Sequence, residues 1–148
     1  MKTETSIAID AAAEVVWQVF TDVERWPEWT ESVTRIVPLD GPAIEVGNRF
    51  EIKQPRMPKL VWQVTAVDPG RGWTWVQRSP GGTTLATHEV IAQGAQRTLV
   101  RQGIDQRGPV GTLVGALMRG TTRRYLQMEA DGLKARSEAR HRHDGATA

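Results

Sequence analysis

The sequence predicts an α+β fold: a curved antiparallel sheet of six to seven strands wrapped around a long C-terminal helix, with two short helices after the first strand. Three observations predict it. From residue 48 to residue 106, short strand-like runs alternate with Pro- and Gly-rich turns, which is typical of an antiparallel meander. From 109 to about 139, apolar residues recur at helical spacing. Since the sheet and the helix each have one apolar face, bending the sheet around the helix buries both.

The segment before the meander predicts one strand, two helices and a second strand. Residues 5–11 alternate and predict the first strand, and residues 11–20 place apolar side chains at helical spacing. Trp26 and Trp29 lie three positions apart in the otherwise polar stretch ERWPEW, where the proline keeps the second helix short. Residues 33–39, VTRIVPL, predict the strand that ends this segment.

The turn lengths of the meander predict which side chains share a face. Strands are expected over 48–54, 60–67, 72–78, 83–92 and 97–105, and residues directly opposite each other in neighbouring strands lie on one face of a sheet. Treating PRMPK, DPGR, SPGG and QGAQ as simple loops produces an apolar, inward face that holds Phe50, Ile52, Trp62, Val64, Trp73, Trp75, Val90 and Leu99. The opposite face is polar, and it includes Gln102.

Polar residues on the inward face predict a hollow rather than a solid core. Loop counting places six of them there: Asn48, Gln77, Thr84, His88, Arg101 and Asp105. A buried polar group without a partner costs about 1–3 kcal/mol, so a solid core would avoid collecting them. A cavity that holds water or a ligand tolerates them.

The C-terminal helical segment supports the same interpretation. Leu117 and Thr121 belong to its apolar face, and the small residues Gly111, Gly115 and Gly120 would leave space between helix and sheet. The alternative is that the glycine-rich half is a loop and that the helix begins later. Residues 1–139 are therefore expected to form a single ligand-binding domain, followed by a disordered polar tail, RHRHDGATA, over 140–148.

Composition excludes several function classes. The chain has 148 residues and a net charge of +2. It contains no cysteine, which excludes disulfides and zinc–thiolate sites. His141 and His143 lack a third metal ligand, so no metal and no cofactor is expected. The basic C-terminal region lacks interleaved aromatic residues, which argues against nucleic acid as a partner. No stretch resembles a signal peptide or a membrane span, so a cytoplasmic location is expected.

The sequence resembles the polyketide cyclase/dehydrase and lipid-transport family of the START-like, Bet v 1-like superfamily, also called SRPBCC. The resemblance covers about residues 3–138 and is carried by IDAAAEVVWQVFTDVERWPEWTESVTRI, VTAVDPGRGWTW, THEV, GAQRTLVRQ and LKARSEA. It implies a helix-grip fold, in which a seven-stranded antiparallel sheet grips a long C-terminal helix around a deep cavity. Trp26 and Trp29 would then lie at the wall or mouth of that cavity. The alternative for both is plain packing of the helix onto the sheet.

The chain departs from the family's cyclases at two positions. Such cyclases typically have a tyrosine shortly after the W-P turn and an arginine on the middle strands that faces the pocket. Here Val33 follows the turn, and the strand over 60–67 contains no arginine. The resemblance therefore implies the fold, and those catalytic roles are not carried over to this chain.

Three functions remain after this comparison. The first is binding of a small hydrophobic molecule, aromatic, polyketide-like or lipid-like, in the cavity. The second is a cyclase or dehydratase that uses His88 and Arg101. A weaker third is a protein-interaction module like the chaperone-activating branch of the superfamily. The ligand and the choice between monomer and homodimer stay open.

His88 and Arg101 are the candidate catalytic residues. Loop counting places the His88 ring between Trp73 and Arg101, where burial and the neighbouring guanidinium would lower the pKa of His88 and keep it neutral at pH 7. A neutral imidazole can accept a proton or hydrogen-bond a ligand hydroxyl. The alternatives are a structural histidine stacked on Trp73 and an Arg101 that points outward.

Overall fold

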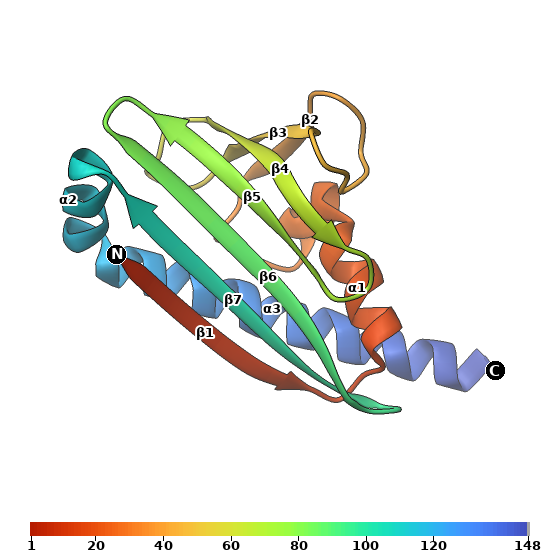
Figure 1. The fold of residues 1–148 in the computed structure, drawn as a ribbon. Helices are drawn as coiled ribbons and strands as arrows, with labels where there is room; N and C mark the ends of the chain where they lie inside the picture. Colours follow the sequence, from red (N-terminus) through yellow and green to blue (C-terminus); the bar gives the residue numbers. More distant parts are fainter. Residues whose placement is uncertain (148) are drawn as a thin grey trace.

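Seven strands form one antiparallel sheet in the order β1-β7-β6-β5-β4-β3-β2 in the computed structural model, which describes residues 1–147 (Figure 1). The strands are β1 Lys2–Ile9, β2 Arg35–Pro38, β3 Arg49–Lys53, β4 Leu60–Asp68, β5 Gly72–Ser79, β6 Gly82–Gly94 and β7 Arg97–Arg107. The helices are α1 Ala13–Thr21, the 3-10 helix η1 Val23–Glu28, α2 Pro109–Leu117 and α3 Arg119–Thr147. α3 crosses the concave side of the sheet from the end near α2 to the end near α1 (Figure 1), so the predicted helix-grip fold is confirmed.

The C-terminal helical segment is divided in two, where the sequence predicts one helix. α2 ends at Leu117 and α3 begins at Arg119, and Met118 between them departs from helical geometry with ψ at 14°. The glycines of α2 explain the division. A Cβ built on Gly111 would lie 3.3 Å from the Cα of Gly82, so α2 packs directly on the ends of the strands before α3 turns along the sheet. Within residues 1–147, no helix is long and apolar enough to cross a membrane.

The register of the central strands confirms much of the predicted pairing. Trp73 lies opposite His88 and Gln77 opposite Thr84, as the turn lengths predict. Phe50 lies opposite Trp62 instead of Val64, a shift of two residues that leaves both side chains on the predicted face.

The register of β6 and β7 differs from the prediction by one residue. The two strands continue to a tight turn between Gly94 and Arg97, and a bulge between Ala92 and Gly94 adds one residue to β6. His88 therefore lies opposite Gln102, and Glu89 lies opposite Arg101. Because a one-residue slip exchanges the two faces of a strand, Gln102 faces inward and Arg101 faces outward, the reverse of the prediction.

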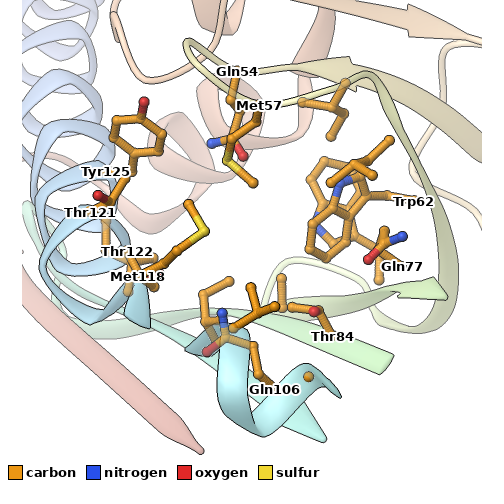
Figure 2. Close-up of a pocket in the computed structure, with 18 of the residues that line it drawn as sticks. Gln54, Met57, Trp62, Gln77, Thr84, Gln106, Met118, Thr121, Thr122 and Tyr125 are labelled. Atoms are coloured by element: carbon orange, nitrogen blue, oxygen red, sulfur yellow. The ribbon is translucent and has the colours of Figure 1, made fainter. Parts of the chain in front are cut away.

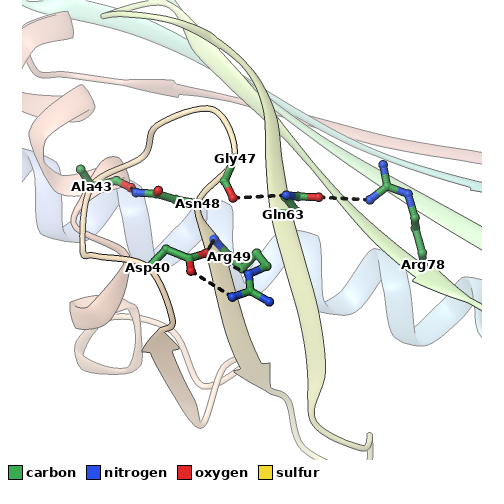
Figure 3. Close-up of polar contacts among 7 residues, drawn as sticks. All are labelled: Asp40, Ala43, Gly47, Asn48, Arg49, Gln63 and Arg78. Carbon is green, nitrogen blue, oxygen red and sulfur yellow. Dashed lines mark hydrogen bonds and ion pairs between the residues drawn. The ribbon is translucent and has the colours of Figure 1, made fainter.

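The connection from β2 to β3 is fixed by polar contacts at the surface (Figure 3). Arg49 donates from Nε and Nη2 to the two carboxylate oxygens of Asp40 at 2.9 and 3.0 Å, which lowers the pKa of Asp40. Asn48 donates from Nδ2 to the carbonyl of Ala43 at 3.0 Å. Asn48, predicted to face the hollow, therefore stabilises its own loop.

Residues 140–147 continue α3 as helix, where the sequence predicts a disordered tail; residue 148 lies outside the described residues. Two contacts join this end of the helix to the loop before α1. The backbone N–H of Ala12 donates to Nδ1 of His141 at 3.4 Å, and the N–H of Asp10 donates to the carboxylate of Glu138 at 2.8 Å. These two hydrogen bonds give a physical reason for the helix to continue beyond residue 139, where the predicted domain ends.

α3 is held against η1 at Trp29. A Cβ built on Gly132 would lie 1.8 Å from the carbonyl oxygen of Trp29, so only glycine allows the helix to approach this closely. Trp26, three residues earlier, is 2 % exposed and donates its indole N–H to the carbonyl of Phe20 at 2.9 Å. The tryptophan pair of the ERWPEW stretch therefore anchors two elements: Trp29 anchors α3 and Trp26 anchors α1.

Candidate ligand-binding cavity

A cavity of about 360 Å³ lies between the concave side of the sheet and the helices α2 and α3 (Figure 2). The sheet, the loop between β3 and β4, and both helices contribute to its lining. Several lining residues are also exposed to solvent, and we call them the mouth residues: Arg56, Pro58, Pro80, Val110, Val114 and Thr121. The cavity therefore opens between the β3–β4 loop, the β5–β6 turn and α2. Its volume lies in the range of small-molecule sites.

The walls of the cavity are mainly apolar and aromatic. Trp62 and Trp75 lie on neighbouring strands with their ring centroids 6.2 Å apart. Met57 from the β3–β4 loop and Met118 from the helix break extend into the space between Tyr125 and Trp62 (Figure 2). Tyr125 of α3 donates its hydroxyl to the carbonyl of Pro55 at 2.7 Å, so the helix and the loop are joined beside the opening. Such a wall favours a ligand with a large apolar surface.

Polar side chains interrupt this wall at defined points. Gln77 of β5 is 8 % exposed and donates from Nε2 to the Ser79 hydroxyl at 2.5 Å. Thr84 of β6 lies opposite it and also lines the cavity. Both positions confirm the inward placement that the turn lengths predict. A ligand with a hydroxyl or carbonyl group would find hydrogen-bonding partners here.

His88 lies at the inner end of the cavity within a cluster of aromatic rings. Its ring stacks on Trp73 with centroids 4.0 Å apart and planes 8° apart, and Phe20 meets it edge-on at 5.4 Å. Burial lowers the pKa of His88 to about 3, so the ring is neutral at pH 7, as predicted. Arg101 does not contribute, because it lies on the outer face and pairs with Glu89 at 3.6 Å.

The tautomer of His88 follows from its hydrogen bond. Nδ1 lies 3.2 Å from the carbonyl oxygen of Trp73, and a carbonyl can only accept, so Nδ1 carries the proton. Nε2 is then a hydrogen-bond acceptor, and His88 lines the cavity. With a pKa of about 3, this nitrogen is a weak base. It is better suited to accept a hydrogen bond from a ligand than to remove a proton.

Gln102 and Glu129 form a second polar part of the cavity wall, and further buried polar groups lie behind them. Gln102 of β7 donates from Nε2 to the carboxylate of Glu129 on α3 at 2.8 Å, and both residues line the cavity. Ser32 also hydrogen-bonds Glu129, and Thr30 lies 2.7 Å from the Ser32 hydroxyl. All four side chains are at most 8 % exposed. The Oε1 atom of Gln102 is buried and has no partner among the described residues.

Burial raises the pKa of Glu129 to about 7, and the hydrogen bonds from Gln102 and Ser32 oppose that rise. A carboxyl group with this pKa is present in both protonation states near neutral pH. It can accept or donate a proton, which is the property that acid–base chemistry requires.

Sequence reasoning missed both Glu129 and Gln102. The spacing of Glu129, four residues after Tyr125 and eight after Thr121, places a carboxylate beside the apolar face of α3 and could have indicated it. Gln102 was assigned to the outer face because the bulge in β6 leaves no clear signal in the sequence.

The structure places the predicted binding residues in three groups. The first lines the cavity and comprises Trp26, Ile52, Trp62, Trp75, Gln77, Thr84, His88 and Thr121. The second is buried or packed around the core without lining the cavity and comprises Trp29, Phe50, Val64, Trp73 and Val90. The third faces away from the cavity and comprises Leu99, Arg101 and Leu117.

Leu99 and Leu117 are corrections with separate causes. Leu99 lies opposite Ile91 on the outer face, because the register of β7 is shifted by the bulge. Leu117 is 78 % exposed, because α2 packs on the strands through its glycines and ends one residue before the bend. Met118 lines the cavity instead.

Solved structures with this fold include an aromatase/cyclase and a norcoclaurine synthase. The Zhui aromatase/cyclase from a Streptomyces species aligns with a TM-score of 0.74 and 16% identity, over 95% of this chain and 94% of that one. Norcoclaurine synthase from Thalictrum flavum, solved with dopamine and hydroxybenzaldehyde, aligns with a TM-score of 0.69 and 12% identity, over 91% and 84%. A hypothetical protein from Helicobacter pylori aligns with a TM-score of 0.76 and 14% identity, over 93% and 88%. At these identities the likeness shows the fold alone.

The sequence itself identifies the family. No curated protein is similar enough in sequence to count as a relative. The profile of one family, described as polyketide cyclase / dehydrase and lipid transport, matches residues 1–138 and so spans every strand together with the helices that enclose the cavity. The chain therefore belongs to the polyketide cyclase/dehydrase and lipid transport family.

Proposed function

We propose that the protein binds a small, mainly apolar molecule that carries hydroxyl or carbonyl groups in the cavity between sheet and helices. The observation that carries this proposal is the cavity of about 360 Å³, in which aromatic walls face buried polar atoms. Oε1 of Gln102 is a buried acceptor without a partner among the described residues, and His88, whose Nδ1 bonds the Trp73 carbonyl, presents Nε2 as an acceptor in the lining. Acceptors in the lining of an apolar cavity favour a ligand that donates hydrogen bonds, such as a phenol or an enol.

The experiment compares one substitution inside the cavity with the same substitution outside it. Thr84→Phe adds a ring to the cavity wall, whereas Thr65→Phe adds it to the exposed outer face of β4. Each protein is purified under native conditions for mass spectrometry of co-purified ligand and titrated with the dye anilinonaphthalene sulfonate. We expect Thr84→Phe to lose the co-purified ligand and to weaken dye binding about tenfold, which is a change of about 1.4 kcal/mol. Equal binding by both variants would contradict the proposal.

A second candidate function is acid–base catalysis on a polyketide-like ligand, and Glu129 is the observation that favours it. Its carboxyl group lines the cavity and has a pKa of about 7. As a carboxylate it could remove a proton from the carbon next to a carbonyl group. The resulting carboxylic acid could then protonate a hydroxyl group that leaves as water, so that a carbon–carbon double bond forms and the carboxylate is restored.

Glu129→Gln separates the carrier from the enzyme. For a carrier, this substitution alters affinity and leaves the bound molecule chemically unchanged. For an enzyme, loss of the general base is expected to lower turnover about 100-fold. Wild type, Glu129→Gln and His88→Gln would be incubated with poly-β-ketone substrates while affinity and product are followed. Equal rates of product formation with wild type and Glu129→Gln would contradict a catalytic role for this residue.

A further inference from the structure

α2 presents large apolar side chains to solvent. Leu113 is 60 % exposed and Leu117 is 78 % exposed, and Val110 and Val114 are 49 % and 40 % exposed. These four residues, which we call the α2 patch, come from one helix of nine residues, Pro109–Leu117. The opposite side of the helix is occupied, since Gly111 and Gly115 pack on the ends of β6 and β7. Clustered exposure of this kind marks a surface that a partner covers.

The chain around the α2 patch is basic. Residues 109–128 contain Arg119, Arg123 and Arg124 and no acidic residue. All three arginines are exposed, and none forms an ion pair with a residue that the structure describes. An apolar patch followed directly by unpaired cations is complementary to a surface that is apolar inside and negatively charged at its boundary.

We propose that α2 and the first turns of α3 dock on the surface of an anionic lipid bilayer. The side chains of Leu113 and Leu117 would insert among the lipid chains, while the three arginines contact the headgroups. A bilayer accepts protruding side chains without a matching groove, which suits a short helix whose apolar residues point outward. An acidic protein partner would instead need a shaped apolar surface opposite α2.

Docking in this orientation places the cavity mouth against the bilayer. Val110 and Val114 belong both to the α2 patch and to the mouth residues. An apolar ligand could then pass between the cavity and the lipid phase without entering water. Transfer through water would expose the apolar surface of the ligand, which is unfavourable. This inference goes beyond the binding of a ligand in the cavity, because it concerns the outer surface and can be tested with the cavity empty or filled.

Vesicle flotation tests the proposal with the full chain. Vesicles of phosphatidylcholine alone and of phosphatidylcholine with phosphatidylserine are used at low and at high salt. We expect the wild type to float with the anionic vesicles at low salt and to dissociate at high salt, because salt screens the arginines. Replacing Arg119, Arg123 and Arg124 together by Gln is expected to weaken binding about 100-fold, since each cation near an anionic surface contributes about fivefold.

Matched variants test the apolar part. Leu113→Gln with Leu117→Gln should abolish flotation, whereas the control Leu39→Gln with Val46→Gln changes two exposed apolar residues elsewhere and should bind like the wild type. Replacing Arg35, Arg71 and Arg97, which are exposed elsewhere in the protein, controls for net charge. The dye titration of the cavity is run on every variant, so loss of vesicle binding with unchanged dye binding supports docking and excludes misfolding.

Three outcomes would overturn the proposal. The wild type does not float with anionic vesicles, or the double leucine variant floats as well as the wild type. In the third outcome, sedimentation shows that the wild type is a dimer that does not bind vesicles, and that the double leucine variant is a monomer. That result would assign the α2 patch to a second copy of the chain.

Discussion

The space between sheet and helices has two halves that are packed in opposite ways. In the packed half, near α1 and η1, aromatic rings fill the volume: Phe20 lies 4.8 Å from Trp73 and 5.8 Å from Trp26, measured between ring centroids. In the hollow half, near α2, the same sheet and the same helix α3 enclose a cavity of about 360 Å³. A single sheet face can therefore provide a solid core and a binding site.

Glycine has opposite effects in the two halves. Gly132 brings α3 against Trp29 and closes the packed half, because no Cβ separates the helix from the carbonyl. Gly111 and Gly115 draw α2 onto the strand ends, away from the line of α3, so that the chain bends at Met118. Close packing at one end of the helical segment thus leaves open space beside it. The position of each glycine, rather than the number of glycines, determines where the cavity lies.

Truncating a side chain should give the largest difference in stability between the packed half and the hollow half. Phe20 is fully buried among aromatic rings, so Phe20→Ala should lower the free energy of unfolding by about 3–5 kcal/mol, through lost burial and an added cavity. Met118→Ala removes a half-buried side chain beside an existing cavity and should cost less than about 1 kcal/mol. Urea denaturation of both variants measures the difference, and equal losses would show that the two halves are packed alike.

Acid should destabilise the protein through the packed half. The pKa of His88 is lowered to about 3, so between pH 6.5 and pH 3 the unfolded chain binds a proton at His88 that the folded chain does not. This contribution to stability is complete above pH 6.5 and is lost as the pH falls. At pH 4 the wild type should have lost about 3 kcal/mol relative to His88→Gln, since each pKa unit corresponds to about 1.4 kcal/mol. Parallel pH profiles for the two proteins would exclude this linkage.

A methyl group at Gly132 should open the packed half. Gly132→Ala introduces a Cβ only 1.8 Å from the Trp29 carbonyl oxygen, so the helix or η1 must move. We expect a loss of about 2–3 kcal/mol in the free energy of unfolding. The matched control is Gly120→Ala, where nothing lies within 4 Å of the added atom and helix propensity should increase stability by up to about 1 kcal/mol. Thermal unfolding of the pair should show opposite signs.

The hollow half should respond to pH in the opposite direction. The pKa of Glu129 is raised to about 7, so between pH 4.5 and pH 7 the folded chain retains a proton at Glu129 that the unfolded chain releases. Stability from this group therefore falls as the pH rises. Relative to Glu129→Gln, the wild type should lose about 2 kcal/mol between pH 5 and pH 7. The exposed Glu24→Gln is the control, and its pH profile should follow the wild type.

The smallest effect is expected on the outer face. Arg101 pairs with Glu89 at 3.6 Å, and both side chains are about half exposed, at 47% and 48%. Arg101→Gln should change stability by less than about 0.5 kcal/mol and leave dye binding to the cavity unchanged. A clear loss of ligand affinity in this variant would mean that Arg101 reaches the cavity, contrary to the register of β6 and β7.

The sequence by itself determined the fold and most of the inward face. Alternation and turn lengths place Trp62, Trp75, Gln77, Thr84 and His88 correctly, because hairpins with tight turns and few bulges preserve a count of residues. The family resemblance pointed to the same helix-grip fold. The interpretation of polar inward residues as a sign of a hollow also holds for Gln77 and Thr84, which line the cavity.

Only the tertiary structure decided which polar groups meet in the cavity. The bulge in β6 places Gln102 instead of Arg101 on the inward face. Successive residues of a strand alternate between the two faces, so one extra residue reverses the face of every side chain that follows. The bend at Met118 depends on contacts between α2 and the strand ends, which lie far apart in the sequence. The pKa of Glu129 depends on burial by elements from three parts of the chain, so no local pattern could set it. Local spacing fixes faces, whereas long-range contacts fix the chemistry of the site.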